Sequence, residues 1–223
     1  MLSYQGKFWK IPPGETPWDL ETTEKWGKGT ENGILKEVGV VPKPLQKPYP
    51  PVFQPFASSE RSIRWCAANN VTAILPPMHE KIERNLFEVY AEASGRPLGE
   101  GVGMLRDIII AETDEEAMEL WQNSGPFTAN AWFVPFGFRK GMEDPETGAT
   151  PTPEEAIANG YALVGSVDTV TRSLETLKAK LPVNWVFGWT HDMLIPHAKL
   201  MKSIELFKTK VLPRVADPAS PVL

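Results

Sequence analysis

Short apolar runs alternate with stretches of helical periodicity from residue 52 onward. The apolar runs are typical of strands and lie at 52–57, 71–75, 104–111 and 183–189. Each is followed by a stretch in which apolar side chains recur every three or four positions, as on one face of a helix. The alternation therefore predicts four β/α units. Because parallel neighbours need a crossover that a helix usually supplies, it also predicts a parallel sheet.

Residues that favour helix ends frame the predicted helices. Thr113 and Glu116 have the spacing of a capping box, and Ser166 is a favoured cap for the helix after it. The last helix is predicted to begin near Pro196 and to end at Pro213, because proline suits a first turn and interrupts a helix interior. The helix after the second strand is expected to bury Ile82, Leu86, Val89 and Ala93 and to end at Gly95.

Two segments depart from the alternation. Residues 1–51 are rich in Pro, Gly and Trp, and are expected to form an extended lead-in without a core of its own. An aromatic and glycine-rich insertion is expected at about 125–165 within a β/α domain that spans 52–223. A closed TIM (β/α)8 barrel needs eight units in about 250 residues. The fold class predicted is therefore a partial TIM (β/α)8-type barrel of about four β/α units.

Composition and charge narrow the function classes. The 223 residues are 42% hydrophobic and 23% charged, as in a globular domain. A formal charge of -5, without runs of Lys or Arg, argues against nucleic acid and anionic membranes as partners. The single cysteine, Cys66, cannot form an internal disulfide and is interpreted as a buried residue. No signal peptide or membrane span is visible, and a cytoplasmic location is expected.

The three histidines are too few and too scattered to propose a metal site. His79 and His197 lie at expected helix starts and are interpreted as solvated surface residues. Trp189, His191 and Asp192 follow the last predicted strand, and in an α/β barrel the loops after the strands build the active site. A role for His191 in a pocket, possible catalysis included, stays open beside that of a hydrogen-bonded loop residue.

Three serines, Ser58, Ser59 and Ser62, lie where the first predicted strand gives way to a helix. Serine is a favoured helix cap, which is one interpretation of these residues. A helix N-terminus also offers unpaired N–H donors and a partial positive charge, so the same residues could hold an anion. Glu60 would repel a phosphate there unless its carboxylate pointed away. Arg106, inside the third strand, would be costly to bury unless it faced the site or a carboxylate.

Several segments resemble the bacterial luciferase-like flavin-dependent monooxygenases, in the C-terminal half of their barrel. In the family's order, these segments are GKFW, PKPLQKPYPPV, FASSERSIRWCAANNV, RDIIIAETDEEA, VGSVDTVTRSLETL and KLMKSIELFKTKVLPRV. The resemblance implies that the four strands correspond to the fifth through eighth of the barrel. It implies dioxygen and reduced FMN, supplied by a separate flavin reductase, as co-substrates. It also implies that Ser58, Ser59 and Ser62 bind the FMN phosphate.

The resemblance further implies an oxidoreductase that acts on a small organic substrate. Aldehydes, alkanesulfonates, terpenes and aromatic compounds all stay open. The chemistry needs a water-poor cavity, and aromatic side chains could line it. The residues expected there are Trp189, His191, Trp132 and Phe136, with Phe133 and Phe138 in the same stretch. That the aromatic stretch covers the barrel's rim is the other interpretation.

The first four strands of the family's barrel, with the histidine near the reactive flavin, have no counterpart in this resemblance. A half barrel leaves sheet edges and an apolar inner face that need partners. The chain is therefore expected to be a homo-oligomer or to require the missing N-terminal half-barrel. The alternative function is a non-catalytic flavin-binding or structural half-barrel module that works only as an oligomer or with a partner chain.

Overall fold

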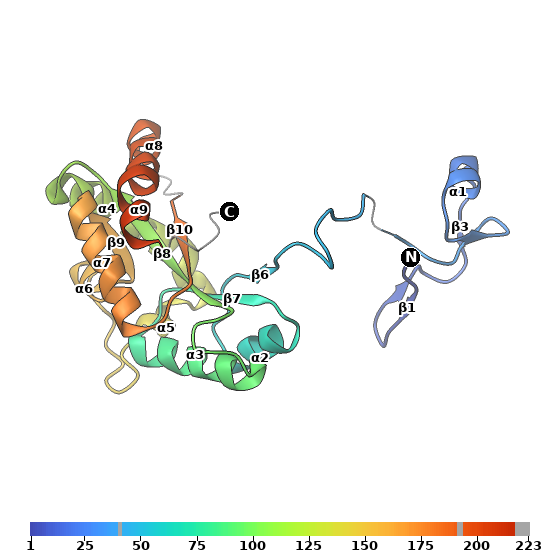
Figure 1. Ribbon diagram of the computed structural model, residues 1–223, viewed down its shortest axis with the longest axis horizontal. Helices are drawn as coiled ribbons and strands as arrows, with labels where there is room; N and C mark the ends of the chain where they lie inside the picture. The colour runs from blue at the N-terminus through green and yellow to red at the C-terminus, as the bar shows by residue number, and fades with distance from the viewer. Residues whose placement is uncertain (40–41, 191–193, 217–223) are drawn as a thin grey trace. The chain divides into compact units, whose positions relative to one another are not determined.

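The computed structural model describes residues 1–39, 42–190 and 194–216 (Figure 1). The chain divides into two units, residues Met1–Pro50 and Pro51–Leu223. No helix within the described ranges is long and apolar enough to cross a membrane.

The first unit contains short strands and one short helix. Its elements are β1 (Tyr4–Gln5), β2 (Lys10–Ile11), β3 (Thr16–Pro17), α1 (Glu21–Trp26), β4 (Thr30–Glu31) and β5 (Ile34–Leu35). β1 and β2 form one antiparallel pair, and β3, β5 and β4 form a second antiparallel sheet. None of the buried hydrophobic residues identified in the structure lies in this unit, whereas Phe8, Trp9 and Trp26 are exposed. Within residues 1–39 and 42–50 the unit therefore has local hairpins but no hydrophobic core of its own.

The second unit is built on a parallel sheet of five strands. These are β6 (Phe53–Gln54), β7 (Thr72–Leu75), β8 (Val102–Ile110), β9 (Ala162–Gly165) and β10 (Trp185–Trp189). The strand order is β10-β8-β7-β6, and β9 pairs with β8. The predicted parallel sheet is confirmed, but the prediction of four strands was wrong. β9 has only four residues between two helices, inside the stretch expected as an insertion, so its local pattern resembled a connection.

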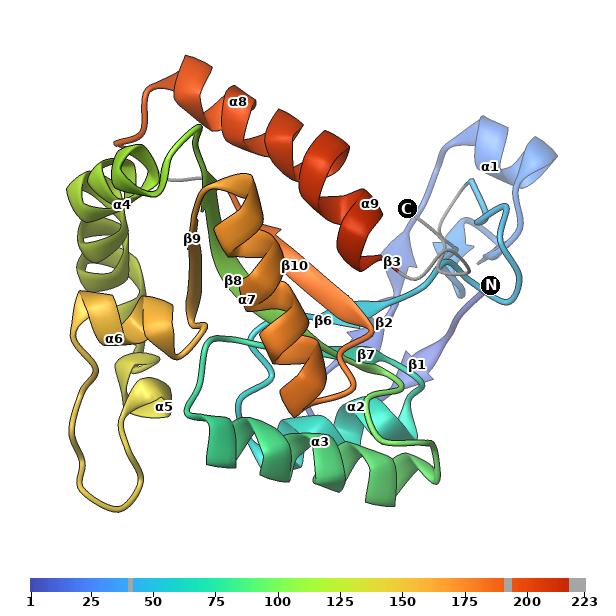
Figure 2. The same ribbon diagram turned by 60° about the vertical axis from the view of Figure 1, so that its left-hand side comes forward.

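Helices cover both faces of this sheet (Figure 2). They are α2 (Glu60–Ala68), α3 (Glu80–Ser94), α4 (Asp114–Thr128), α5 (Arg139–Met142), α6 (Pro153–Ala158), α7 (Val167–Lys180), α8 (His197–Leu206) and α9 (Leu212–Val215). Ile108 and Ile110 of β8 pack with α7, whereas Ile109 and Ala111 pack with α4. Because neighbouring residues of a strand point to opposite faces, α4 and α7 lie on opposite sides of β8.

The position of β9 explains why helices occupy both faces. Asp107 pairs with Trp189 of β10 and also with Ala162 of β9, so these two strands lie on opposite edges of β8. The chain thus moves back across β8 between β9 and β10. Right-handed crossovers in opposite directions place their helices on opposite faces. The parallel α/β sheet is thus established, and the partial (β/α)8 barrel stays a prediction.

Most predicted helix ends are confirmed. Ser59, Thr113 and Ser166 cap α2, α4 and α7 through their hydroxyls, and Gly95 ends α3 with φ 69°. The prediction that the last helix ends at Pro213 was wrong. A π-helical turn, Phe207–Val211, leads into α9, and Pro213 lies in the first turn of α9, where its missing N–H costs no hydrogen bond.

The buried face of α3 is rotated from the predicted one. Leu86 and Val89 are buried as expected, but Ile82 is only half-buried and Ala93 is exposed. Glu83 takes a buried position instead, because its carboxylate pairs with Arg106 of β8. The buried face of α3 therefore combines this ion pair with the apolar side chains of Leu86, Phe87, Val89 and Tyr90.

Candidate functional site

The serine cluster lies at the start of α2, directly after the carboxyl end of β6. Ser59 has extended backbone angles, and its Oγ accepts a hydrogen bond from the Ser62 amide at 3.3 Å. The Oγ atoms of Ser59 and Ser62 lie 2.9 Å apart. Ser58 and Ser59 are exposed and Ser62 is half-buried. The structure thus brings the three predicted residues together on an accessible helix N-terminus, where Ser59 is also the cap.

The charged residues around this N-terminus leave room for an anion. The carboxylate of Glu60 accepts a hydrogen bond from the Asn85 side chain at 3.1 Å and is thereby directed toward α3. Arg64 pairs with Glu92 at 2.9 Å. Arg61 is exposed in the first turn of α2 and forms no hydrogen bond or ion pair with the described residues. A phosphate at the serines would therefore have a cation nearby, with the carboxylate of Glu60 held elsewhere.

The start of α7 offers the same backbone geometry but is already filled. Asp114 accepts hydrogen bonds from the Ser166 amide at 2.6 Å and the Thr169 hydroxyl at 2.9 Å. These bonds, with the Ser166 amide first, lower the pKa of Asp114. Gly165 has φ +152°, and a Cβ there would lie 2.8 Å from the Asp114 Oδ1 atom. Glycine at position 165 thus leaves space for the Asp114 carboxylate, which accepts the hydrogen bond of the Ser166 amide.

An aromatic cluster adjoins the serine segment. Phe56, two residues before Ser58, packs against Phe138 with ring centroids 5.0 Å apart and against Phe133 at 5.9 Å. Trp189 contacts Phe133 at 5.5 Å and Phe56 at 6.4 Å. The indole N–H of Trp189 is buried and has no acceptor in the described part of the chain. The cluster therefore joins the loop after β6, the end of β10 and the segment after α4.

The stretch after α4 is helical and divides the predicted pocket residues. A π-helical turn, Ala129–Phe133, is followed by a 3-10 turn, Val134–Phe136. Trp132 and Phe136 are 54% and 71% exposed and lie outside the cluster. Phe133 and Phe138 face inward. The helical turns explain the division, because neighbouring residues of a helix point in different directions.

An apolar cavity of about 310 Å³ lies beside the cluster. Phe133 and Phe138 form part of its wall, and Leu105 and Asp107 of β8 and Trp121 of α4 also line it. Leu105, Asp107 and Trp121 were missed as site residues. Alternation along 104–111 separates the two faces of the strand but does not indicate which face borders a cavity.

The remaining predicted residues divide between surface, core and the part not described. His191 and Asp192 lie outside the described residues. His197 is exposed, as expected, but His79 is half-buried, and its Nε2 lies 3.8 Å from an Asp144 oxygen. His79 is therefore not the solvated surface residue that was predicted. Arg106 faces a carboxylate, Glu83, which confirms one of its two expected environments.

No family model matches the chain, and no curated protein matches it in sequence. Solved structures do match. The oxygenating constituent of 3,6-diketocamphane monooxygenase from Pseudomonas putida, in complex with FMN, has TM-score 0.66 and 22% identity, over 97% of this chain and 59% of its own. Monooxygenase RslO1 from Streptomyces bottropensis has TM-score 0.64 and 18% identity, over 91% and 56%. A long-chain alkane monooxygenase has TM-score 0.53 and 14% identity, over 85% and 47%.

The likeness to these solved structures concerns the fold. This chain spans less than two thirds of the length of each. At these identities the shared feature is the arrangement of strands and helices, and side-chain roles do not follow from it. The chain has the fold of part of the flavin monooxygenases that its sequence resembles.

Proposed function

We propose that the chain is part of a luciferase-like monooxygenase that uses reduced FMN and dioxygen to oxidise a small organic substrate. Its own contribution is the FMN phosphate site, formed by Ser58, Ser59 and Ser62. One observation carries this proposal: the start of α2 is open, carries three serines, and has its acidic residue Glu60 bonded to Asn85. A neighbour in fold is in complex with FMN, which supports the choice of ligand.

The residues at the start of α2 fit a phosphate group. Ser59 and Ser62 place two hydroxyls 2.9 Å apart, and either can turn its proton toward an anion. The first amides of a helix have no intrahelical acceptor and can donate to phosphate oxygens. Arg61 adds a positive charge in the same turn. The chain's residues would thus bind and orient the cofactor at its phosphate end.

When bound, reduced FMN would supply the electrons for the reaction with dioxygen. At the end of FMN that reacts with dioxygen, residues of this chain would exclude water. Phe56 packs against Phe133 and Phe138, which line the apolar cavity, and the same Phe56 lies two residues before Ser58. Phe56 thus connects the serine segment to two residues of the cavity wall, and we assign the cavity to the organic substrate.

Trp189 belongs to this proposed substrate site through its contact with Phe133. Its orphan indole N–H is a donor without a protein acceptor in the described region. Trp132 and Phe136 lie on the exposed side of the same segment, so they could contact the substrate only from that side. His191 follows β10 in the sequence, and on that basis alone we retain it as a candidate residue of the substrate site.

A second function is supported by the sheet edges. β6 and β10 end the strand order, and no further strand pairs with either among the described residues. The matched solved structures continue beyond the part that this chain covers. The chain would then be a flavin-binding or structural module that works as a homo-oligomer or with a partner chain. Turnover of reduced FMN by the purified chain alone would favour the enzyme over the module.

The phosphate site is tested by comparing FMN with riboflavin, which lacks the phosphate. The double variant Ser59→Ala with Ser62→Ala should lower FMN affinity about tenfold or more, since charge-assisted hydrogen bonds contribute roughly 1.5–3 kcal/mol. Riboflavin affinity should hardly change. Flavin fluorescence titration of the full chain, with phosphorus NMR of FMN, measures both.

Ser166→Ala is the matched control, because it removes the serine cap of α7 and leaves α2 intact. It should leave both flavin affinities unchanged. Equal FMN and riboflavin affinities in the unaltered chain, or an unchanged ratio in the double variant, would show that the serines are a helix cap only.

A further inference from the structure

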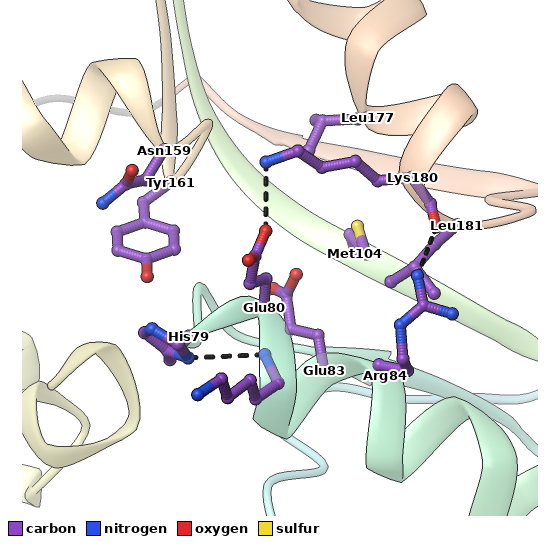
Figure 3. Close-up of a pocket in the computed structure, with 11 residues that line it drawn as sticks. His79, Glu80, Glu83, Arg84, Met104, Asn159, Tyr161, Leu177, Lys180 and Leu181 are labelled. Carbon is purple, nitrogen blue, oxygen red and sulfur yellow. Dashed lines mark hydrogen bonds and ion pairs between the residues drawn. The ribbon is translucent and has the colours of Figure 1, made fainter. Parts of the chain in front are cut away.

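A second cavity of about 350 Å³ adjoins β8 at Met104 (Figure 3). It is bounded by the start of α3, the end of α7 and the residues that lead into β9. Met104, Leu177 and Leu181 contribute apolar surface, and polar side chains surround them. Met104 precedes Leu105 in β8, and Leu105 lines the apolar cavity. The two cavities therefore lie on opposite faces of the strand, and Tyr161, which directly precedes β9, lines both.

A gap in the sheet creates this second cavity. β7 ends at Leu75, which pairs with Met104, and β9 begins at Ala162, which pairs with Asp107. Neither strand covers the two residues between Met104 and Asp107 on that edge of β8. Arg106, which is fully buried, fills part of the gap: its guanidinium donates to the Leu105 carbonyl at 2.8 Å.

Two buried polar side chains face the cavity with an atom that has no partner. The Glu83 Oε1 atom accepts from Arg106 at 2.7 Å and from the Met78 amide at 3.3 Å, but Oε2 accepts no hydrogen bond within the described residues. The Tyr161 hydroxyl also lacks a hydrogen bond there. Glu83 and Tyr161 are only 4% and 5% exposed. Figure 3 shows the Tyr161 hydroxyl directed into the cavity, toward His79.

The protonation of these groups defines what they can recognise. Burial, with the nearby charge of Glu83, raises the pKa of Tyr161 to about 12, so the hydroxyl keeps its proton and can donate. Burial also raises the pKa of Glu83, and the ion pair with Arg106 opposes that rise and favours the carboxylate. The cavity thus presents one hydroxyl donor and, at the Glu83 oxygen that Arg106 does not contact, one acceptor.

The carboxylates around the cavity are each paired with a cation. Glu83 pairs with Arg106, and Glu80 pairs with Lys180 at 3.1 Å. Arg84 also lines the cavity, donates to the Lys180 carbonyl at 2.9 Å and forms no ion pair with the described residues. An anionic ligand at Glu83 would be repelled by that carboxylate, and a cationic ligand would approach Arg84. An uncharged ligand avoids both repulsions.

We propose that this cavity binds an uncharged small molecule that carries a primary carboxamide. The amide N–H of the ligand would donate to Glu83 Oε2, and its carbonyl oxygen would accept from the Tyr161 hydroxyl. An apolar or aromatic body would lie on Met104, Leu177 and Leu181. Two polar atoms that are open to the cavity and have no protein partner in the described part of the chain favour a ligand that bonds to both. This proposal does not depend on flavin binding.

The test uses three probes of one shape: benzamide, benzoate and benzylammonium. Each is titrated into the full chain and followed by ligand-observed NMR and calorimetry. Benzamide should bind saturably at one site with millimolar or tighter affinity, and the two ions at least about fivefold more weakly. Equal binding of the three probes, or no saturable binding of benzamide, would overturn the proposal.

Two variants sharpen the test. Tyr161→Phe should weaken benzamide binding about three- to tenfold, since it removes one hydrogen bond. Tyr90→Phe is the matched control: the Tyr90 hydroxyl donates to the Val71 carbonyl, and Tyr90 is not among the cavity's lining residues. Glu80→Gln should raise benzoate affinity relative to benzamide, because Lys180 then loses its carboxylate. Unchanged benzamide affinity in Tyr161→Phe would contradict the assignment, whatever FMN does in the same preparation.

Discussion

Helices α2 and α7 begin in the same way but differ in what their first turns can accept. Each follows a parallel strand, and each is capped by a serine whose hydroxyl accepts from the amide three residues later. At α7 the carboxylate of Asp114 already bonds to the Ser166 amide. At α2 the acidic residue of the first turn, Glu60, is bonded to Asn85 instead. A serine cap is therefore common to both helices, and they differ in whether a carboxylate from another helix bonds to the amide of the cap residue.

The largest effect is expected when α2 is made to resemble α7. Ser59→Asp keeps a favoured cap, so the helix should stay stable. Its carboxylate should repel the FMN phosphate and lower FMN affinity at least about tenfold, while riboflavin affinity stays the same. Fluorescence titration of both flavins gives the affinities, and thermal unfolding checks the cap. If Ser59→Asp binds FMN as tightly as the unaltered chain does, the phosphate binds elsewhere.

The reverse change should make the N-terminus of α7 available to an anion. Asp114→Ala removes the acceptor of the Ser166 amide and of the Thr169 hydroxyl. Because Asp114 is exposed, the loss in unfolding free energy should be modest, about 1 kcal/mol. Inorganic phosphate should then shift the Ser166 amide resonance in the variant and leave it unmoved in the unaltered chain. If phosphate shifts the Ser166 resonance in neither protein, an open, serine-capped helix is insufficient for anion binding.

The carboxylate at α7 also predicts a pH dependence of stability. The pKa of Asp114 is lowered from its ordinary value of 3.8, so its contribution to stability is present above about pH 4. That contribution is lost as the pH falls through the lowered pKa of the folded state. The difference in unfolding free energy between the unaltered chain and Asp114→Asn should therefore shrink on acidification from pH 7 to pH 3. A difference that is constant over this range would contradict the bonding at α7.

At these two helix N-termini the sequence predicts the capping residues but not their partners from distant parts of the chain. Both caps were predictable, because Ser59 and Ser166 stand directly before helical periodicity. The occlusion of α7 was not, because Asp114 and Ser166 are 52 residues apart along the chain. Likewise, the need of Arg106 for a partner was visible, but Glu83, 23 residues away, could not be identified as that partner.

The missed strand β9 and the divided aromatic segment have a different cause. Ala162–Gly165 is too short to show a period, and its burial comes from packing between α4 and α7. In the aromatic segment, a π-helical turn decides that Phe133 faces the cluster while Trp132 does not. Tertiary packing determined the first outcome and the helical turn the second, and the local pattern of apolar residues predicted neither.

The smallest effect is expected from Glu60, and it tests the basis of the comparison. Glu60→Gln removes the charge in the first turn of α2 but keeps an oxygen that can accept from Asn85. If the carboxylate of Glu60 is held toward α3, its charge is already far from a phosphate at the serines and is screened by solvent. FMN affinity should then rise by no more than about twofold, roughly 0.4 kcal/mol. The measurement is made at low and at moderate salt, with riboflavin as the control. A tenfold gain in FMN affinity at low salt would show that Glu60 faces the phosphate, and α2 would then be restricted by its own carboxylate much as α7 is by Asp114.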